Sequence, residues 1–325
     1  MDRRGEILRA FVAGLLLAVA ACASAPEADA PVTRDSLRAL RWIAPGADQV
    51  EALTRDPVDC APAPIGVGRP SVDEAKAELL MDGKMAFESP ALLGGAAARM
   101  GLSCSSCHLN GRGNAVFFVE GVSGAPGTAD VTSSLFSKVR GNGAFDPVPI
   151  PDLAARDGKQ IKDRKSQAFR DKVHGLVVEE FDGQEPPPQV FEALLAYLDS
   201  EDSANCPAPG ATTRRYYMND LTSAISAAKV AERPGVSRDV ALFYIRVARE
   251  RLERLSERYA GAALASRREQ LLALSQMLAN NAELMRAGKP VKPLDSWIKL
   301  AGDLDADASR SLYNPETLRA ALARS

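Results

Sequence analysis

The sequence predicts a mainly α-helical protein with long Gly- and Pro-rich loops in its middle and a helical hairpin at its C-terminal end. A capping box of Ser71 and Glu74 indicates a helix over 71–89, and prolines followed by apolar residues on one face indicate another over 188–202. Between them, residues 109–152 are rich in Gly and Pro, which is typical of loops. Over 241–259, apolar residues recur at alternating steps of four and three, the spacing of a helix that packs against another helix.

The N-terminus has the features of an export signal, assigned to residues 1–21. A positively charged start is followed by an apolar run over 10–21, which is too short to span a bilayer. The run ends V-A-A-C and so resembles the lipobox of bacterial lipoproteins, in which the cysteine, here Cys22, carries the lipid. The alternative is an ordinary secretory peptide that is removed together with Cys22. We expect a periplasmic protein held in a membrane by its lipid, with the outer membrane favoured, and a tether and N-terminal segment over 22–59.

The charge composition argues against a nucleic-acid partner. The chain has 40 Lys and Arg against 42 Asp and Glu, a net charge of −2. Proteins that bind nucleic acids usually carry a clear excess of positive charge. We therefore expect no binding to nucleic acid.

Two of the five cysteines stand apart in Pro- and Ala-rich surroundings. Cys60 lies in DPVDCAPAP and Cys206 in SANCPAPG. An exported chain meets an oxidising compartment, where thiols tend to be paired. We expect a disulfide between Cys60 and Cys206 that closes residues 60–206 into one domain. The alternative is two solitary buried cysteines, because sequence alone does not fix the connectivity.

The segment that these cysteines bracket contains C-S-S-C-H, with Cys104, Cys107 and His108 as its reactive positions. This is the attachment motif of c-type haem, in which two thiols on one helical turn bond to the haem vinyl groups. The next residue, His108, is then the proximal ligand of the iron. A thioredoxin-like pair would need a strand before it and a helix after it, but the flanks here are Gly, Ser and Asn. A structural zinc site would need a second ligand pair, so we expect one covalent haem c.

The sixth ligand of the iron is sought in RKSQAFRDKVHGLVVEEF, which predicts a further helix. The apolar stripe of this helix consists of Phe169, Val173, Leu176 and Val177. His174, the only other histidine, lies at the edge of that stripe and is expected to be the distal ligand. The alternatives are a histidine with an ordinary hydrogen bond, ligation by Met218 or Met100, and an open five-coordinate iron.

Residues 75–199 resemble the bacterial di-haem cytochrome c peroxidase superfamily, especially its single-haem relatives. The resemblance rests on DGKMAFES, GLSCSSCH, SGAPGTADVTSSLFSKVRGNGAFDPVPIPDL, DRKSQAFRDKVHGLVVEEFDG and LLAYLDS. It implies a cytochrome c-like haem domain over 60–206. It also implies that Asp163 and Arg164 stand at the turn before the distal helix, and that His174 matches the distal ligand.

The chain departs from the peroxidases in having a single CxxCH motif and therefore one covalent haem. With His108 and His174 on the iron, both axial positions would be filled, which suits one-electron transfer. We expect a lipid-anchored monohaem cytochrome that exchanges electrons with a redox protein. The alternative is a peroxidase- or oxidase-type enzyme of this superfamily with an open or labile axial site.

The loop after His108 is expected to wrap the haem edge. Arg112, Lys138 and Arg140 are candidates for the haem propionates, because charge-assisted hydrogen bonds to carboxylates are strong. Arg140, in an R-G-N-G turn, is the preferred one, and ordinary surface cations are the alternative. Residues 207–325 are expected to form a helical domain, with a hairpin over 241–285 and no catalytic residues.

Overall fold

The computed structural model describes residues 32–55, 57–64, 71–155, 162–206, 213–291 and 297–324. The described residues all belong to one compact unit, residues 31–325. The predicted export signal and Cys22 therefore lie outside the described residues. Within these ranges, no helix is both long enough and apolar enough to cross a membrane.

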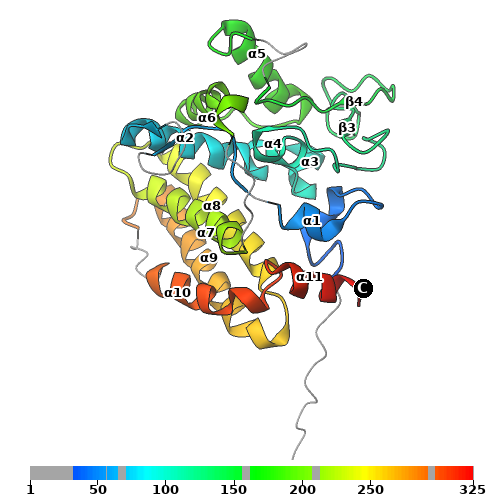
Figure 1. The fold of residues 1–325 in the computed structure, drawn as a ribbon. Coiled ribbons are helices and arrows are strands. Elements are labelled where there is room, and N and C mark those ends of the chain that lie inside the picture. Colours follow the sequence, from blue (N-terminus) through cyan, green and yellow to red (C-terminus); the bar gives the residue numbers. More distant parts are fainter. Residues whose placement is uncertain are drawn as a thin grey trace, which may run out of the picture. The chain divides into compact units, whose positions relative to one another are not determined.

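The described chain is mainly helical, which confirms the predicted class (Figure 1). The first half contributes α1 (Gln49–Leu53), α2 (Glu74–Phe87), α3 (Gly95–Met100), α4 (Cys104–Cys107), α5 (Gln167–Gly175) and α6 (Pro188–Ser200). The second half contributes α7 (Thr213–Glu232), α8 (Arg238–Arg258), α9 (Ala265–Arg286), α10 (Trp297–Asp307) and α11 (Pro315–Leu322). Strands are short: β1 (Ala63–Pro64) pairs in parallel with β2 (Ser71–Val72), and β3 (Thr128–Ala129) pairs antiparallel with β4 (Val148–Pro149).

Helices α2 and α6 pack directly against each other. The side chain of Asp73 caps α2 by accepting a hydrogen bond from the backbone N–H of Lys76, at 2.8 Å. The predicted cap at Ser71 is not formed, because Ser71 belongs to β2. Gly83 lets the two helices touch, since a Cβ atom at this position would overlap the backbone carbonyl of Ala193.

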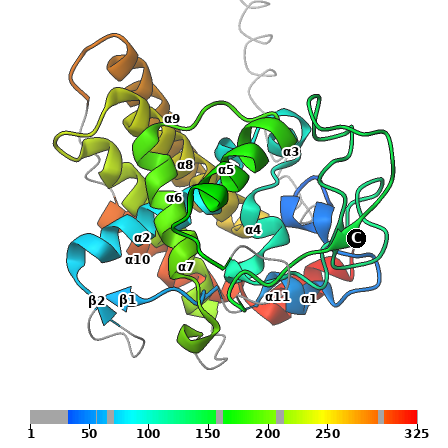
Figure 2. The same ribbon diagram turned by 90° about the horizontal axis from the view of Figure 1, so that it is seen from above.

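The predicted C-terminal hairpin is present and consists of α8 and α9, with α7 packed on α8. The three helices lie side by side in both views (Figures 1 and 2). Every predicted seam residue of α8 is buried: Ala241, Ile245, Ala248, Leu252, Leu255 and Tyr259. The spacing in the sequence therefore identified the face of α8 that enters the core.

The predicted haem domain, 60–206, and the predicted helical domain, 207–325, share a hydrophobic core. Met85 and Ala86 of α2 and Val190 of α6 belong to the same buried cluster as the inner faces of α7, α8 and α9. The segment before Cys60 also contributes to the fold, because α1 packs against α11. Residues 31–325 accordingly form one compact unit.

Candidate haem site

The C-S-S-C-H motif forms a single helical turn, α4, with reciprocal capping at its start. The backbone N–H of Ser103 donates to Oγ of Ser106 at 3.1 Å, and the side chain of Ser103 caps the first turn in return. At the other end, the N–H of His108 donates to the carbonyl of Cys104 at 2.8 Å. This local structure brings Cys104, Cys107 and His108 to the wall of one cavity.

The cavity is apolar and has a volume of about 330 Å³, within the range of roughly 300–1,000 Å³ typical of ligand sites. Its wall combines α4 with residues from α2, α5 and α6 and from the long loop after α4. The polar residues among the described lining are few: Ser103, Cys104, Cys107, His108 and Lys172. A flat, largely apolar ring system suits such a wall, because few polar groups have to give up water.

His108 has the geometry of an oriented metal ligand. Its Nδ1 lies 3.1 Å from the carbonyl oxygen of Pro151, which can only accept, so this contact favours the tautomer with the proton on Nδ1 and the lone pair on Nε2. Burial lowers the pKa of His108 to about 4, and the imidazole is therefore neutral at physiological pH. A backbone carbonyl on the other ring nitrogen is a common way of fixing a ligating histidine.

Cys104 and Cys107 are free thiols, in contrast to Cys60 and Cys206. Burial raises the pKa of both to about 12, so the thiol forms prevail. Across the described ranges, no three His, Cys, Asp or Glu side chains gather in the way a metal ion would need. Two thiols, a neutral imidazole and an apolar cavity fit the attachment of a haem through thioether bonds.

His174 lies outside this cavity. Its Nε2 is 2.7 Å from Oε2 of Glu185, and its ring packs edge-on against Phe191 with 5.9 Å between centroids. The structure therefore does not bring His174 and His108 together. The residues of α5 and of the π-helical turn after it, Leu176–Glu180, that line the cavity are Phe169, Lys172, Val173, Leu176 and Val177.

The two methionines considered as ligands also lie away from the cavity wall. Met218, on α7, packs in the core shared with α8 and α9. Met100, at the end of α3, packs in the apolar cluster around Phe117 without lining the cavity.

Arg140, the expected propionate partner, is engaged elsewhere. Its Nε donates to Oε2 of Glu179 at 2.7 Å, and its guanidinium lies 3.9 Å from Glu180. The other two candidates are also paired, Arg112 with Asp152 and Lys138 with Asp182. None of the three arginine and lysine candidates lines the cavity.

Lys172 is the cavity-lining cation that the sequence analysis missed. It stands three residues after Phe169 and four before Leu176, on the apolar stripe, and that position was the available signal. Arg164, singled out by the resemblance, is buried and donates hydrogen bonds to the carbonyls of Leu153 and Leu198. Its role is to tie the end of α6 to the loop that carries Pro151.

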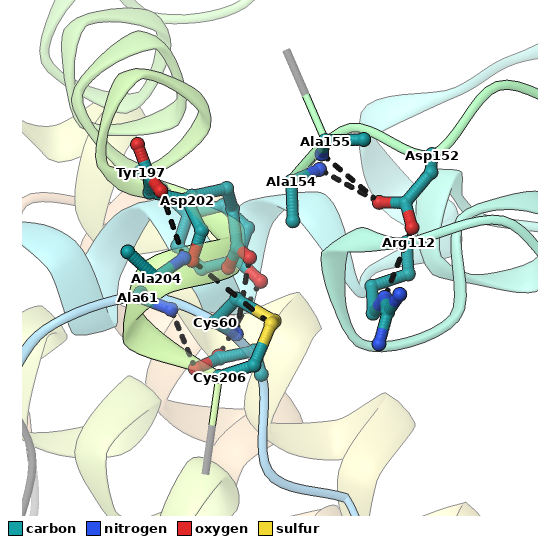
Figure 3. The surroundings of a disulfide bond; sticks show 12 residues. Cys60, Ala61, Arg112, Asp152, Ala154, Ala155, Tyr197, Asp202, Ala204 and Cys206 are labelled. Atoms are coloured by element: carbon teal, nitrogen blue, oxygen red, sulfur yellow. Dashed lines mark hydrogen bonds and ion pairs between the residues drawn. A yellow bond between two sulfur atoms is a disulfide. The ribbon is translucent and has the colours of Figure 1, made fainter. Parts of the chain in front are cut away.

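The predicted disulfide between Cys60 and Cys206 is present, with 4.1 Å between the Cα atoms (Figure 3). Next to it, the backbone N–H of Cys60 donates to Oε2 of Glu201 at 3.1 Å. Burial and the nearby Asp59 raise the pKa of Glu201 to about 8. The Glu201 carboxylate also lies against Gly111, where a Cβ would overlap it, so the disulfide end of the domain touches the turn after His108.

Comparison with known proteins gave no relative. No protein-family model matches the chain, and no curated protein or solved structure matches it either. Function is therefore inferred from the residues of the site and their geometry.

Proposed function

We propose that this chain is an exported monohaem c-type cytochrome that transfers single electrons. Cys104 and Cys107 would hold one haem c through thioether bonds, and His108 would be the proximal ligand. The observation that carries the proposal is that the C-S-S-C-H turn forms part of the wall of an apolar cavity, with both thiols and the imidazole among the residues that line it. In keeping with the resemblance seen in the sequence, residues 60–206 would then be a cytochrome c-like haem domain.

When bound, the haem supplies a centre that gains and loses one electron. The side chains and backbone around the cavity would determine the ligation and the reduction potential of that centre. The carbonyl of Pro151 orients His108 and favours the proton on its Nδ1. The apolar wall excludes water and makes the extra positive charge of the oxidised state less favourable, which raises the reduction potential.

An electron carrier needs a haem edge near the surface. Val148 lines the cavity and is at the same time 59% exposed. The wall beside β4 is therefore thin, and a redox protein that docks there would approach the haem closely. The N-terminal signal and the lipobox-like V-A-A-C support a location in the periplasm, with the lipid on Cys22 as the membrane attachment.

A second candidate function is that of a peroxidase- or oxidase-type enzyme with an accessible axial site. It is favoured by one observation, the hydrogen bond of His174 to Glu185, which leaves the imidazole away from the cavity. The single haem would then need a partner protein as its source of electrons.

The experiment is to express the full chain in a host that matures c-type cytochromes. We expect a mass increase of one haem, a pyridine haemochrome spectrum with two thioether bonds, and loss of covalent haem in the Cys104→Ala/Cys107→Ala double variant. Mass spectrometry of the mature N-terminus tests the lipid on Cys22. A colourless wild-type protein with the mass of the bare polypeptide, apart from any lipid, would contradict the proposal.

A further inference from the structure

The histidines and methionines, the side chains considered above for the sixth position of a haem iron, can be followed through the described residues. Both histidines, and every methionine after Met1, lie in the described residues. Among them, His108 is the one that lines the cavity. Met81, Met85, Met218 and Met285 pack in the core of α7, α8 and α9, Met277 is exposed, and Met100 packs beside the cavity without lining it.

Helical geometry keeps His174 away from the cavity. The lining residues of α5 form one face, and His174 follows Val173 by about 100° of helical rotation, beyond that face. Rotating α5 to present His174 would withdraw the buried Val173 and Val177 from the core. It would also break the hydrogen bond to Glu185 and the contact with Phe191.

The remaining wall of the cavity is apolar and comes largely from the long loop after α4. Val122, Ala129, Val131, Phe136 and Phe181 line it. An anion that enters such a wall loses its hydration without gaining donors, whereas a small neutral molecule has little hydration to lose. Among the described lining residues outside the motif, Lys172 is the one titratable side chain, so there is no acid–base pair of the kind that peroxide cleavage uses.

We propose that no histidine or methionine of the described residues other than His108 ligates the haem iron, and that its sixth position is a binding site for small neutral diatomic molecules, such as carbon monoxide and nitric oxide. This inference rests on the proposed covalent haem. It assigns His174 a structural role, as the hydrogen-bond partner of Glu185 that fixes the rotation of α5.

The test is spectroscopy of the purified full-length haem protein, together with the variants His174→Gln and Lys172→Ala. His174→Gln keeps a donor for Glu185 but removes the imidazole. We expect a five-coordinate, high-spin ferrous form that binds carbon monoxide, with dissociation constants in both variants within about twofold of the wild-type value. At equal concentration, the ferric protein should bind nitric oxide more tightly than azide, because azide is an anion.

Two results would overturn the inference while leaving the covalent haem intact. The first is a low-spin resting protein in both oxidation states, converted to high spin by His174→Gln or by Lys172→Ala, which would identify the missing ligand. The second is azide binding as tight as that of nitric oxide. A protein without covalent haem would instead contradict the proposed function itself, so the two failures are distinguishable.

Discussion

Lys172 is the residue through which the chain can most directly set the charge next to the proposed haem. Its side chain lines the cavity, and its positive charge acts together with burial to lower the pKa of His108. In Lys172→Gln we expect a lower midpoint reduction potential, because removing a positive charge stabilises the ferric state. A redox titration measures this, with Lys138→Gln, at an 88% exposed side chain, as the control. An unchanged potential in Lys172→Gln, or equal shifts in both variants, would contradict it.

Glu201 gives a pH dependence with a definite sign. The pKa of its carboxyl is raised by burial from 4.5 to about 8 in the folded protein. Between these values the folded state binds the proton and the unfolded state does not, so stability falls as pH rises, by at most about 1.4 kcal/mol per pH unit. Below pH 4.5 and above pH 8, Glu201 no longer makes the free energy of unfolding depend on pH.

Glu201→Gln removes the titrating proton and should flatten this dependence. The measurement is the melting temperature of wild type and variant from pH 4.5 to pH 8, compared at each pH. We expect the melting temperature of the variant, relative to that of the wild type, to increase as pH rises. Parallel curves would show that another group causes the slope.

The residues of the site differ in how far sequence could predict them. Cys104, Cys107 and His108 were predictable because one capped helical turn determines their geometry. The placement of His174 was not, since it depends on Glu185, eleven residues away, and on which face of α5 enters the core. Arg140 likewise depends on a partner, Glu179, that lies 39 residues away in sequence. The spacing of apolar residues indicates which face of a helix enters the core, but it does not decide on which side of the boundary a residue at the edge of that face lies.

At the scale of elements, the contact between α2 and α6 depends on the absence of a side chain at Gly83. Gly83→Ala would improve helix propensity by about 1 kcal/mol, but the added Cβ would overlap the carbonyl of Ala193 and the side chain of Tyr197. Overpacking of this kind costs about 1–3 kcal/mol. We therefore expect a net loss of stability in chemical denaturation.

Gly302 provides the matched control for this prediction. It lies in α10, and a Cβ added there would have no atom within 4 Å. Gly302→Ala should be neutral or raise the free energy of unfolding by up to about 1 kcal/mol. If the two variants changed the free energy of unfolding by the same amount, helix propensity, and not the close contact between α2 and α6, would explain the effect at Gly83.

Helices α2, α5, α6, α8 and α9 were predictable because apolar residues recur in them at helical spacing. The buried seam of α8 is an example, and the proline at the start of α6 is a further signal. The cap of α2 was misplaced by two residues, at Ser71 in place of Asp73, because Ser71 pairs with β1. Pairing between strands of two residues depends on tertiary contacts and leaves no periodic signal in the sequence.

At the scale of the molecule, the sequence predicts two domains, whereas residues 31–325 form one compact unit in which a buried cluster draws on both parts. A Pro- and Ala-rich linker does suggest a boundary near 207. The side chains that join the two parts, Met85 and Ala86 on α2, read as ordinary helix residues. The other members of their buried cluster are mainly on α7, α8 and α9, far along the chain, and a single sequence holds no record of such packing.

Buried charges also cross the predicted domain boundary, and they offer the sharpest test of cooperativity. Arg251 of α8, 2% exposed, lies 2.7 Å from Glu88 beside α2 and 3.5 Å from Asp220 of α7. Arg251→Met would leave two buried carboxylates without their central cation, although Lys84 and Arg254 are near enough to compensate in part. We expect a loss of about 3 kcal/mol.

Arg246→Met is the control, because Arg246 is on the same helix and its pair with Glu250 is largely exposed on the arginine side. Surface pairs of this kind contribute about 0–1 kcal/mol. Denaturation followed both by haem absorbance and by helical circular dichroism should give coincident transitions, since residues 31–325 form one compact unit and a buried cluster joins its two parts. In Arg251→Met both transitions should move together to lower denaturant concentration. If the transition seen by circular dichroism moved while the transition seen by haem absorbance did not, the C-terminal helices would unfold independently of the haem site.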